Sequence, residues 1–161
     1  AIGLLSGLIL SKIKNYKDIV LVEPNSKRLG ECIKHLDANV VNPDNKAILD
    51  NHFDIVFDTV GLDDTRKQAI SSVKPGGTII HIGLTQASGS FDFRKATLQE
   101  ITFIGTYCYT NKDFEKTLRI LANKKIGSLE WIEYRELKNG SSAFKEIDDG
   151  ICKAPKIILL T

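Results

Sequence analysis

The sequence predicts an α/β protein whose strands form a doubly wound parallel sheet, with helices on both faces. Short apolar runs rich in β-branched residues, at 19–22, 53–57 and 78–83, alternate with helical stretches. Polar or glycine-containing turns separate them, and the short spacing is typical of strands joined by right-handed crossover helices. In such sheets, ligands bind beyond the carboxyl ends of the strands.

The rest of the chain is organised around its first 28 residues. Gly3 opens an apolar helical run, a buried strand follows at 19–22, and Glu23 stands at its end, about 20 residues after the glycine. This is the second half of a dinucleotide-binding βαβ unit, where phosphates lie over the helix start and the acid holds a ribose hydroxyl. Only the last glycine of G-x-G-x-x-G is in the sequence, so we expect a sheet that lacks its first strand. The alternative is an ordinary helix–strand pair with a solvated Glu23.

The composition excludes several classes of protein. With 161 residues, 42% hydrophobic and 26% charged, the chain has the size and balance of one globular domain, with room for an appended subdomain. The net charge is +2 and the lysines are scattered, so we expect no nucleic-acid partner. Because no apolar run approaches the roughly 20 residues of a membrane span, we expect no membrane partner either.

Cysteine and histidine usage argues against disulfides and against a metal site in these residues. The three cysteines lie far apart and have no pairing pattern, which favours a reduced, cytoplasmic location. The three histidines are isolated and lack ligand spacing. The first residues have neither the basic region nor the cleavage site of a signal peptide.

In the first part of the chain, apolar residues at 4, 5, 8, 9 and 13 predict a helix over residues 4–14. Residues 19–22 are a continuous apolar run, as in a strand covered on both faces. Pro24 ends this strand, and Asn25 or Ser26 can cap a helix that runs to about residue 35. A short strand at 39–41 and a turn at 42–44, opening a short helix through Leu49, complete this part.

The middle of the chain contains two further buried strands. Residues 53–57 form the first, which delivers Asp58-Thr59-Val60-Gly61 at its carboxyl end. A helix over about 63–73 and a turn at 74–77 lead to the second, at 78–83. The expected ligand positions at the strand ends are therefore Glu23, residues 59–61 and residues 82–84.

After Leu84 the pattern changes, and we expect a C-terminal α+β extension. The amphipathic spacing of apolar residues predicts helices, and β-rich or alternating runs predict strands. The expected segments are an extended piece at 91–93, a strand at 101–107, a helix at 113–123, an edge-type strand at 131–137, a helix at 142–148 and a strand at 157–160.

Together these segments resemble the back part of the medium-chain zinc-type alcohol dehydrogenase family. D-I-V-F-D-T-V-G at 54–61 resembles the family's strand that ends under the cofactor, and V-K-P-G-G-T-I-I-H-I-G-L at 73–84 resembles its most regular segment. I-T-F-I-G-T-Y at 101–107 and A-P-K-I-I-L-L at 154–160 follow in the family's order. The resemblance covers essentially the whole chain. It implies a Rossmann-type NAD-binding domain over 1–104 and a C-terminal segment over 105–161 that packs on a catalytic domain.

The resemblance also implies roles for single residues. Gly3 is similar to the last glycine of the phosphate loop, and Ile2 and Leu4 to residues that flank the pyrophosphate. Glu23 is similar to the acid that accepts hydrogen bonds from the adenosine ribose, where a carboxylate repels a 2′-phosphate and so favours NAD over NADP. Arg28 matches a basic position near the same ribose, although a solvated helix residue explains it equally well.

Further positions belong to the path of the cofactor in the family. Val60 and Gly61 resemble the pair between adenine and nicotinamide, and Ile82, Gly83 and Leu84 resemble the segment whose backbone holds the nicotinamide carboxamide. Lys156 falls where the family often has a basic residue near the pyrophosphate, with an ordinary surface lysine as the alternative.

The family's catalytic zinc ligands and much of its substrate pocket lie on an amino-terminal domain that this sequence does not contain. We therefore expect a fragment of an enzyme that transfers hydride between an alcohol and NAD, with no catalytic residue or metal ligand of its own and no activity alone. The resemblance further implies a homodimer, with residues 88–93 and the strand from 101 as candidate edges.

Two other functions remain open at this point. One is a zinc-free, NADPH-dependent member similar to quinone reductases, against which Glu23 argues. The other is a non-catalytic Rossmann-type module. Nothing in these residues distinguishes one alcohol substrate from another.

Overall fold

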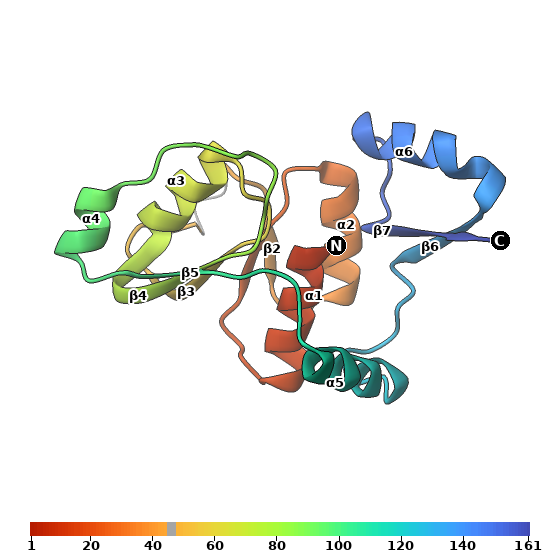
Figure 1. Ribbon diagram of the computed structural model, residues 1–161, viewed down its shortest axis with the longest axis horizontal. Helices are drawn as coiled ribbons and strands as arrows, with labels where there is room; N and C mark the ends of the chain where they lie inside the picture. The colour runs from red at the N-terminus through yellow and green to blue at the C-terminus, as the bar shows by residue number, and fades with distance from the viewer. Residues whose placement is uncertain (45–47) are drawn as a thin grey trace. The chain divides into compact units, whose positions relative to one another are not determined.

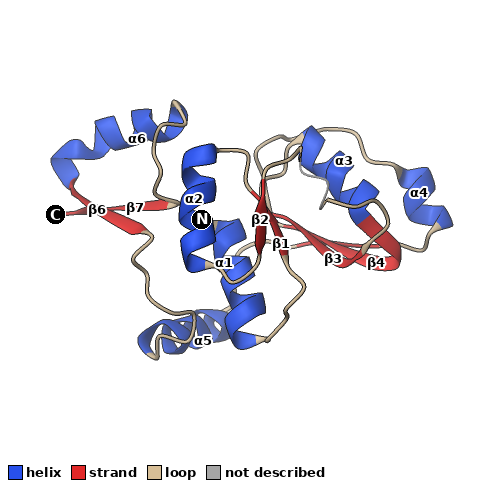
Figure 2. Cartoon of the chain, turned by 180° about the vertical axis from the view of Figure 1, so that it is seen from behind, coloured by secondary structure: helices blue, strands red, loops and turns tan. Residues whose placement is uncertain are grey.

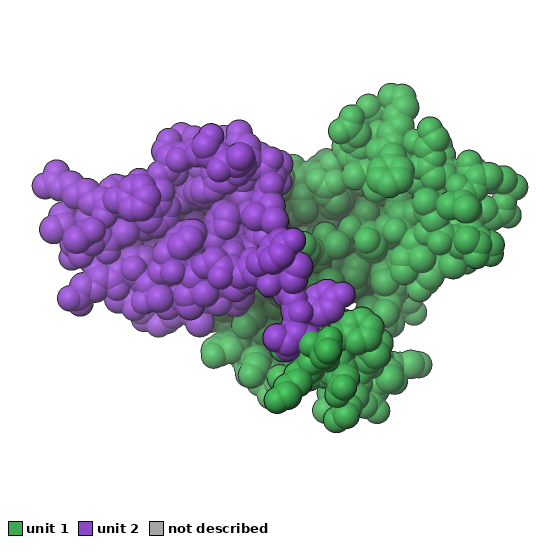
Figure 3. Space-filling model, viewed as in Figure 1, with its two compact units in different colours: residues 1–45, 111–161 green, residues 46–110 purple. Residues whose placement is uncertain are grey.

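The computed structural model describes residues 1–44 and 48–161. It divides into two compact units, unit 1 with residues 1–45 and 111–161 and unit 2 with residues 46–110 (Figure 3). The short helix expected through Leu49 lies in part outside the described residues.

The first part of unit 1 is a helix–strand–helix–strand sequence. Helix α1 (Ile2–Leu8) continues into the π-helical turn η1 (Ile9–Ile13), which is closed by a 3.0 Å bond from Lys14 N to Ile9 O. Strands β1 (Val20–Val22) and β2 (Asn39–Val41) pair in parallel on either side of helix α2 (Ser26–His35) in the sequence. Of the two expected caps, Asn25 is the one used, because its Oδ1 accepts hydrogen bonds from the N–H groups of Lys27 and Arg28.

The second part of unit 1 contains a parallel β–α–β arrangement. Its elements are α5 (Asn111–Ala122), β6 (Ile132–Glu136), the 3-10 turn η2 (Leu137–Asn139), α6 (Gly140–Asp148) and β7 (Lys156–Leu160). Strands β6 and β7 lie side by side (Figure 2). Arg135 on β6 donates hydrogen bonds to both carboxylate oxygens of Glu146 on α6, at 3.0 and 2.7 Å, and so ties this strand to α6.

An apolar core holds α1 in unit 1. Leu4 and Leu8 project from α1 and are 3% and 1% exposed. They pack with buried residues from α2 and from the segment before β6, namely Cys32, Leu36, Ile126 and Trp131. Burial of these side chains supplies most of the free energy that keeps a helix this short in place.

Unit 2 is a three-stranded parallel sheet in the order β3-β4-β5, against which α3 packs (Figure 1). Its core is a cluster of Ala69, Ile70, Val73 and Ile79 from α3 and β4. The elements are β3 (Phe53–Asp58), α3 (Asp63–Ser72), β4 (Val73–His81), α4 (Phe93–Leu98) and β5 (Thr102–Gly105).

Two local predictions for unit 2 are wrong. Residues 74–77 were expected to form a turn, but β4 already begins at Val73 and absorbs them, with a register shift opposite Phe53–Ile55 and a φ of +72° at Gly76. The extended piece at 91–93 ends early, because Asp92 Oδ1 accepts a 2.8 Å hydrogen bond from Lys95 N and thereby starts α4 at Phe93.

The α/β class with parallel strands is confirmed. The described residues form three separate sheets, however, rather than one: β1-β2, β3-β4-β5 and β6-β7. Among them, β1 pairs with β2 alone and β3 with β4 alone, so each has one edge without a partner strand. The domain division at residue 104 stays a prediction.

No helix in the described part of the chain has both the length and the apolar character needed to cross a bilayer.

The core of unit 2 predicts the effect of truncating its central strand. Ile79 is 1% exposed, whereas Ile55 on the neighbouring β3 is 45% exposed. In urea unfolding of the complete protein, we expect Ile79→Ala to lower the free energy of unfolding by about 2–5 kcal/mol, because it leaves a cavity. Ile55→Ala, the matched control, should cost less than about 1 kcal/mol. Equal losses for the two variants would contradict the position of this core.

Candidate functional site

Two backbone segments cross in direct contact at the carboxyl ends of β3 and β4. A Cβ atom placed on Gly83 would lie 2.0 Å from the carbonyl carbon of Val60, and one placed on Gly61 would lie 2.2 Å from Gly83 O. Gly61 also has a φ of +76°, a conformation that favours glycine. Both glycines singled out in the sequence are therefore required by one close approach.

Asp58, at the end of β3, fixes this crossing through hydrogen bonds. Its buried carboxylate accepts hydrogen bonds at Oδ1 from Val60 N, at 3.1 Å, and from Gly61 N, at 2.8 Å. Its carbonyl oxygen accepts from Ile82 N and Gly83 N, at 2.8 and 3.0 Å. One aspartate thus holds the ends of both strands.

The segment after the crossing, residues 84–90, is attached to the start of α3. Arg66 donates hydrogen bonds to the carbonyl oxygens of Gly61, Gln86 and Ser88. Asp63 N donates to Gln86 Oε1, and the Asp63 carboxylate accepts from Ser90 N. Lys67 and the Ser90 N–H together lower the pKa of Asp63 to about 2, so this carboxylate is ionised at neutral pH.

In unit 1, Glu23 lies directly after β1, and its backbone N–H donates to Val41 O at 2.9 Å. Its Oε1 accepts hydrogen bonds from Asn25 N, at 3.0 Å, and from Arg28 Nε, at 3.3 Å. The side chains of Glu23 and Arg28 are 21% and 29% exposed, so the pair is accessible to a ligand. Both hydrogen bonds that the structure gives the carboxylate go to the same oxygen.

Of the charged residues predicted for unit 1, Glu23, Arg28 and Lys156 lie within electrostatic range of Ala1, the residue before α1.

The three apolar positions predicted there differ in access. Ile2 is 49% exposed and Gly3 is half-buried, whereas the side chain of Leu4 is part of the core. Leu4 can therefore face a phosphate only through its backbone N–H. The first intrahelical bond runs from Leu5 N to Ala1 O, which is why the N–H groups before Leu5 are the ones available to an anion.

The structure brings the predicted residues together as two groups, one in each unit. Unit 1 holds Ile2, Gly3, Leu4, Glu23, Arg28 and Lys156, and unit 2 holds Val60, Gly61, Ile82, Gly83 and Leu84. In unit 2 the side chains of Val60 and Leu84 are 42% and 72% exposed, while both glycines are buried.

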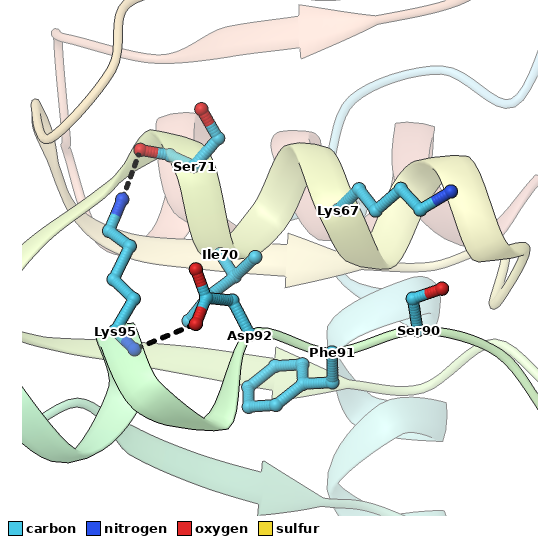
Figure 4. Close-up of a pocket in the computed structure, with 7 residues that line it drawn as sticks. All are labelled: Lys67, Ile70, Ser71, Ser90, Phe91, Asp92 and Lys95. Carbon is cyan, nitrogen blue, oxygen red and sulfur yellow. Dashed lines mark hydrogen bonds between the residues drawn. The ribbon is translucent and has the colours of Figure 1, made fainter.

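A hollow of about 450 Å³ in unit 2 lies away from the crossing, between α3 and residues 90–95 (Figure 4). Lys95 Nζ donates a 2.9 Å hydrogen bond to Ser71 O across it, and Asp92 caps α4. These polar groups hold α3 and α4 together, and we assign no ligand to the hollow.

In the described ranges, no group of three or more His, Cys, Asp or Glu residues is placed to hold a metal ion. Within those ranges, the residues present do not fit a zinc site. All three cysteines are free, with Cys32 and Cys152 buried and Cys108 exposed.

Sequence reasoning missed the residues that support the crossing. Asp58 had a usable signal, since aspartate before a turn often accepts hydrogen bonds from the N–H groups two and three residues on. Arg66 had none, because a basic residue in a helix reads as solvent-exposed until the tertiary structure places carbonyl groups around it.

The sequence matches a known family over most of its length. Residues 1–123 match the family described as zinc-binding dehydrogenase. The chain therefore belongs to the zinc-binding dehydrogenases.

Curated relatives agree with this family. D-xylulose reductase of Saccharomyces cerevisiae is 26% identical over 158 residues, which is 90% of this chain and 44% of the relative. Sorbitol dehydrogenase 1 of the same yeast is 27% identical over 81 residues, which is 50% of this chain and 23% of the relative. The chain thus spans less than half the length of these curated relatives.

Solved structures share the fold. L-idonate 5-dehydrogenase from Escherichia coli superposes with a TM-score of 0.80 at 23% identity, over 100% of this chain and 48% of that one. A protein described as a short chain alcohol dehydrogenase from E. coli CFT073, in complex with NADH, gives 0.81 at 17% identity, over 99% and 49%.

The crossing predicts that an alanine at Gly83 cannot be accommodated. Because its Cβ would meet backbone atoms rather than a flexible side chain, we expect Gly83→Ala to lower the free energy of unfolding by at least about 3 kcal/mol in urea unfolding. Gly30→Ala, on α2, is the control: nothing lies within 4 Å of its added Cβ, and because alanine favours a helix the free energy of unfolding should not fall. If Gly83→Ala were as stable as this control, the described crossing would be incorrect.

Proposed function

We propose that this chain is the NAD-binding part of a zinc-dependent alcohol or polyol dehydrogenase. The observation that carries the proposal is the Glu23 carboxylate, partly exposed at the end of β1 and held through one oxygen by Asn25 N and Arg28 Nε. A carboxylate at this place can accept hydrogen bonds from the two hydroxyls of an adenosine ribose. The polyol class rests on the names of the relatives, D-xylulose reductase and sorbitol dehydrogenase.

The same carboxylate selects between the two nicotinamide cofactors. A 2′-phosphate would bring further negative charge next to the Glu23 carboxylate, whose negative charge already faces the guanidinium of Arg28 at 3.3 Å. The two negative groups would therefore repel each other. NAD carries a hydroxyl there and can donate to the carboxylate. NAD is therefore the proposed cofactor, and the NADPH-dependent quinone-reductase-like alternative is disfavoured.

The nicotinamide end of the cofactor is assigned to residues 82–84 in unit 2. A side chain on Gly61 or Gly83 would collide with the backbone of the other segment, so the crossing brings the two segments together beside the exposed Val60 and Leu84. Because Ile82 N and Gly83 N already donate to Asp58 O, a carboxamide would be held by the Leu84 N–H and by a backbone carbonyl oxygen of residues 82–84.

NAD supplies the hydride acceptor when bound, and this chain binds and orients it. The described residues offer no cluster of metal ligands. In the complete enzyme, a zinc held by residues outside this chain would polarise the alcohol. We therefore propose that activity needs the complete enzyme and that this chain alone turns over no substrate. A non-catalytic module would also bind nucleotide without turnover, and activity of the complete enzyme distinguishes the two.

We further propose a homodimer through the free edge of β5. This strand ends the β3-β4-β5 sheet, and Phe103 and Ile104 on it are 48% and 44% exposed. Residues 88–92 are not a strand in the structure, so they do not extend this edge.

The role of Glu23 predicts the cofactor preference. In calorimetric titration of the complete protein, we expect NADH to bind at least about tenfold more tightly than NADPH, and Glu23→Ser to remove that difference. Glu31→Ser, which deletes another carboxylate from the same helix region, is the control and should leave the preference unchanged. Tighter binding of NADPH to the unmodified protein would refute the role of Glu23, and binding of neither cofactor would refute the proposed function.

A further inference from the structure

Arg66, in the second turn of α3, binds the segment after the crossing through two of its guanidinium hydrogen bonds. Its guanidinium donates four hydrogen bonds: Nη2 to Gly61 O at 2.9 Å and to Gln86 O at 2.5 Å, Nη1 to Ser88 O at 2.9 Å, and Nε to His81 Nε2 at 3.3 Å. One side chain therefore joins the end of β3, the end of β4 and the loop that follows Leu84.

We propose that Arg66 is a positioning residue that holds residues 82–88 in the conformation that binds nicotinamide. This inference rests on the proposed function and assigns to Arg66 a part of it that neither the sequence pattern nor the relatives indicate. Arg66 acts on the cofactor through the loop backbone and does not itself contact it.

The position of Arg66 is not explained by the stability of α3. A cation near a helix amino terminus opposes the helix dipole, whereas Asp63 and Asp64 in the first turn favour it. Arg66 is nevertheless half-buried, and all four hydrogen bonds of its guanidinium run to residues outside its helix. The arrangement therefore serves the segments that Arg66 contacts.

The loop needs such an anchor because burial does not hold it. Residues 84–90 are all exposed, so little hydrophobic free energy orders them. Thr85 N and Gln86 N donate to Val60 O and Gly61 O at 3.2 and 3.0 Å, but these bonds reach only the first part of the loop. The Asp63 carboxylate holds Ser90 N at the other end, and Arg66 attaches the stretch between them through Ser88 O, which lowers the entropy that the loop would lose on binding a ligand.

His81, the last residue of β4, lies between Arg66 and Asp58. Its Nε2 accepts from Arg66 Nε at 3.3 Å and lies 3.5 Å from Asp58 Oδ2. Asp58 holds Val60 and Gly61 through its other oxygen. Arg66 therefore supports both sides of the crossing, one through Gly61 and one through the loop.

The test compares two ligands of the complete protein, NADH and ADP-ribose, which lacks the nicotinamide. We expect Arg66→Gln to raise the dissociation constant for NADH about tenfold, as for one or two lost hydrogen bonds, and to leave that for ADP-ribose within about twofold. Arg66→Lys should behave like Arg66→Gln, since an ammonium cannot reproduce the planar fork. Arg94→Gln, the same change at an exposed position on α4, is the control and should affect neither ligand.

A second variant reaches the same contact from the loop. A Cβ on Gly89 would lie 2.4 Å from Arg66 Nη1 and 2.7 Å from Asp63 Oδ1, so Gly89→Ala should displace the guanidinium and weaken NADH binding selectively. This variant decides the matter if Arg66→Gln does not fold.

The possible failures are distinguishable. If the unmodified protein bound neither ligand, the proposed function would fail, and this inference with it. If the unmodified protein bound both and the Arg66 variants either kept NADH affinity or lost both ligands equally, the positioning role alone would be overturned.

Discussion

The arrangement of unit 2 depends on a backbone crossing in which neither partner can carry a side chain. Gly61 and Gly83 come within van der Waals contact of each other's segments, and Asp58 closes the crossing with its carboxylate and its carbonyl oxygen. Ligands bind beyond the ends of parallel strands in this fold, so the crossing also lies directly beside the proposed nicotinamide site. The exposed loop after Leu84 takes its course from the same point.

The two groups of predicted residues would recognise their parts of the cofactor by different physical interactions. In unit 1 the selective element is a charge: the Glu23 carboxylate, oriented by Asn25 and Arg28, distinguishes a ribose hydroxyl from a phosphate. In unit 2 it is backbone packing: the two missing side chains let the segments around Gly61 and Gly83 touch, which fixes the position of the exposed Val60 and Leu84. Charge is adjustable by a single substitution, whereas the crossing is tied to the stability of the sheet. We therefore expect cofactor preference to change more readily than nicotinamide binding.

The periodic and glycine patterns were sufficient to predict the main elements and the strand ends at which the candidate residues lie. Apolar runs predicted the strands, Asn25 was one of two expected caps, and Gly61 and Gly83 were singled out because they follow buried strands.

The prediction was wrong where tertiary contacts override local preference. Lys74–Gly77 reads as a turn in isolation, but pairing with β3 draws it into β4 as an irregular stretch. Phe93 alternates with Phe91 as in a strand, yet the Asp92 cap places it in α4. Arg66 could not be found at all, because its partners are carbonyl groups, which every residue has and which only the fold gathers in one place.

Amide chemical shift mapping of the complete, ¹⁵N-labelled protein during titration with NADH tests the central claim most directly. The account predicts that the largest shifts fall on the amides of Val60, Gly61 and residues 82–84 in unit 2, together with residues 23–28 in unit 1. ADP-ribose should reproduce the second set and not the first. Shifts confined to residues 90–95 around the hollow beside α3, or absent from the Gly61–Gly83 crossing while NADH binds, would contradict it.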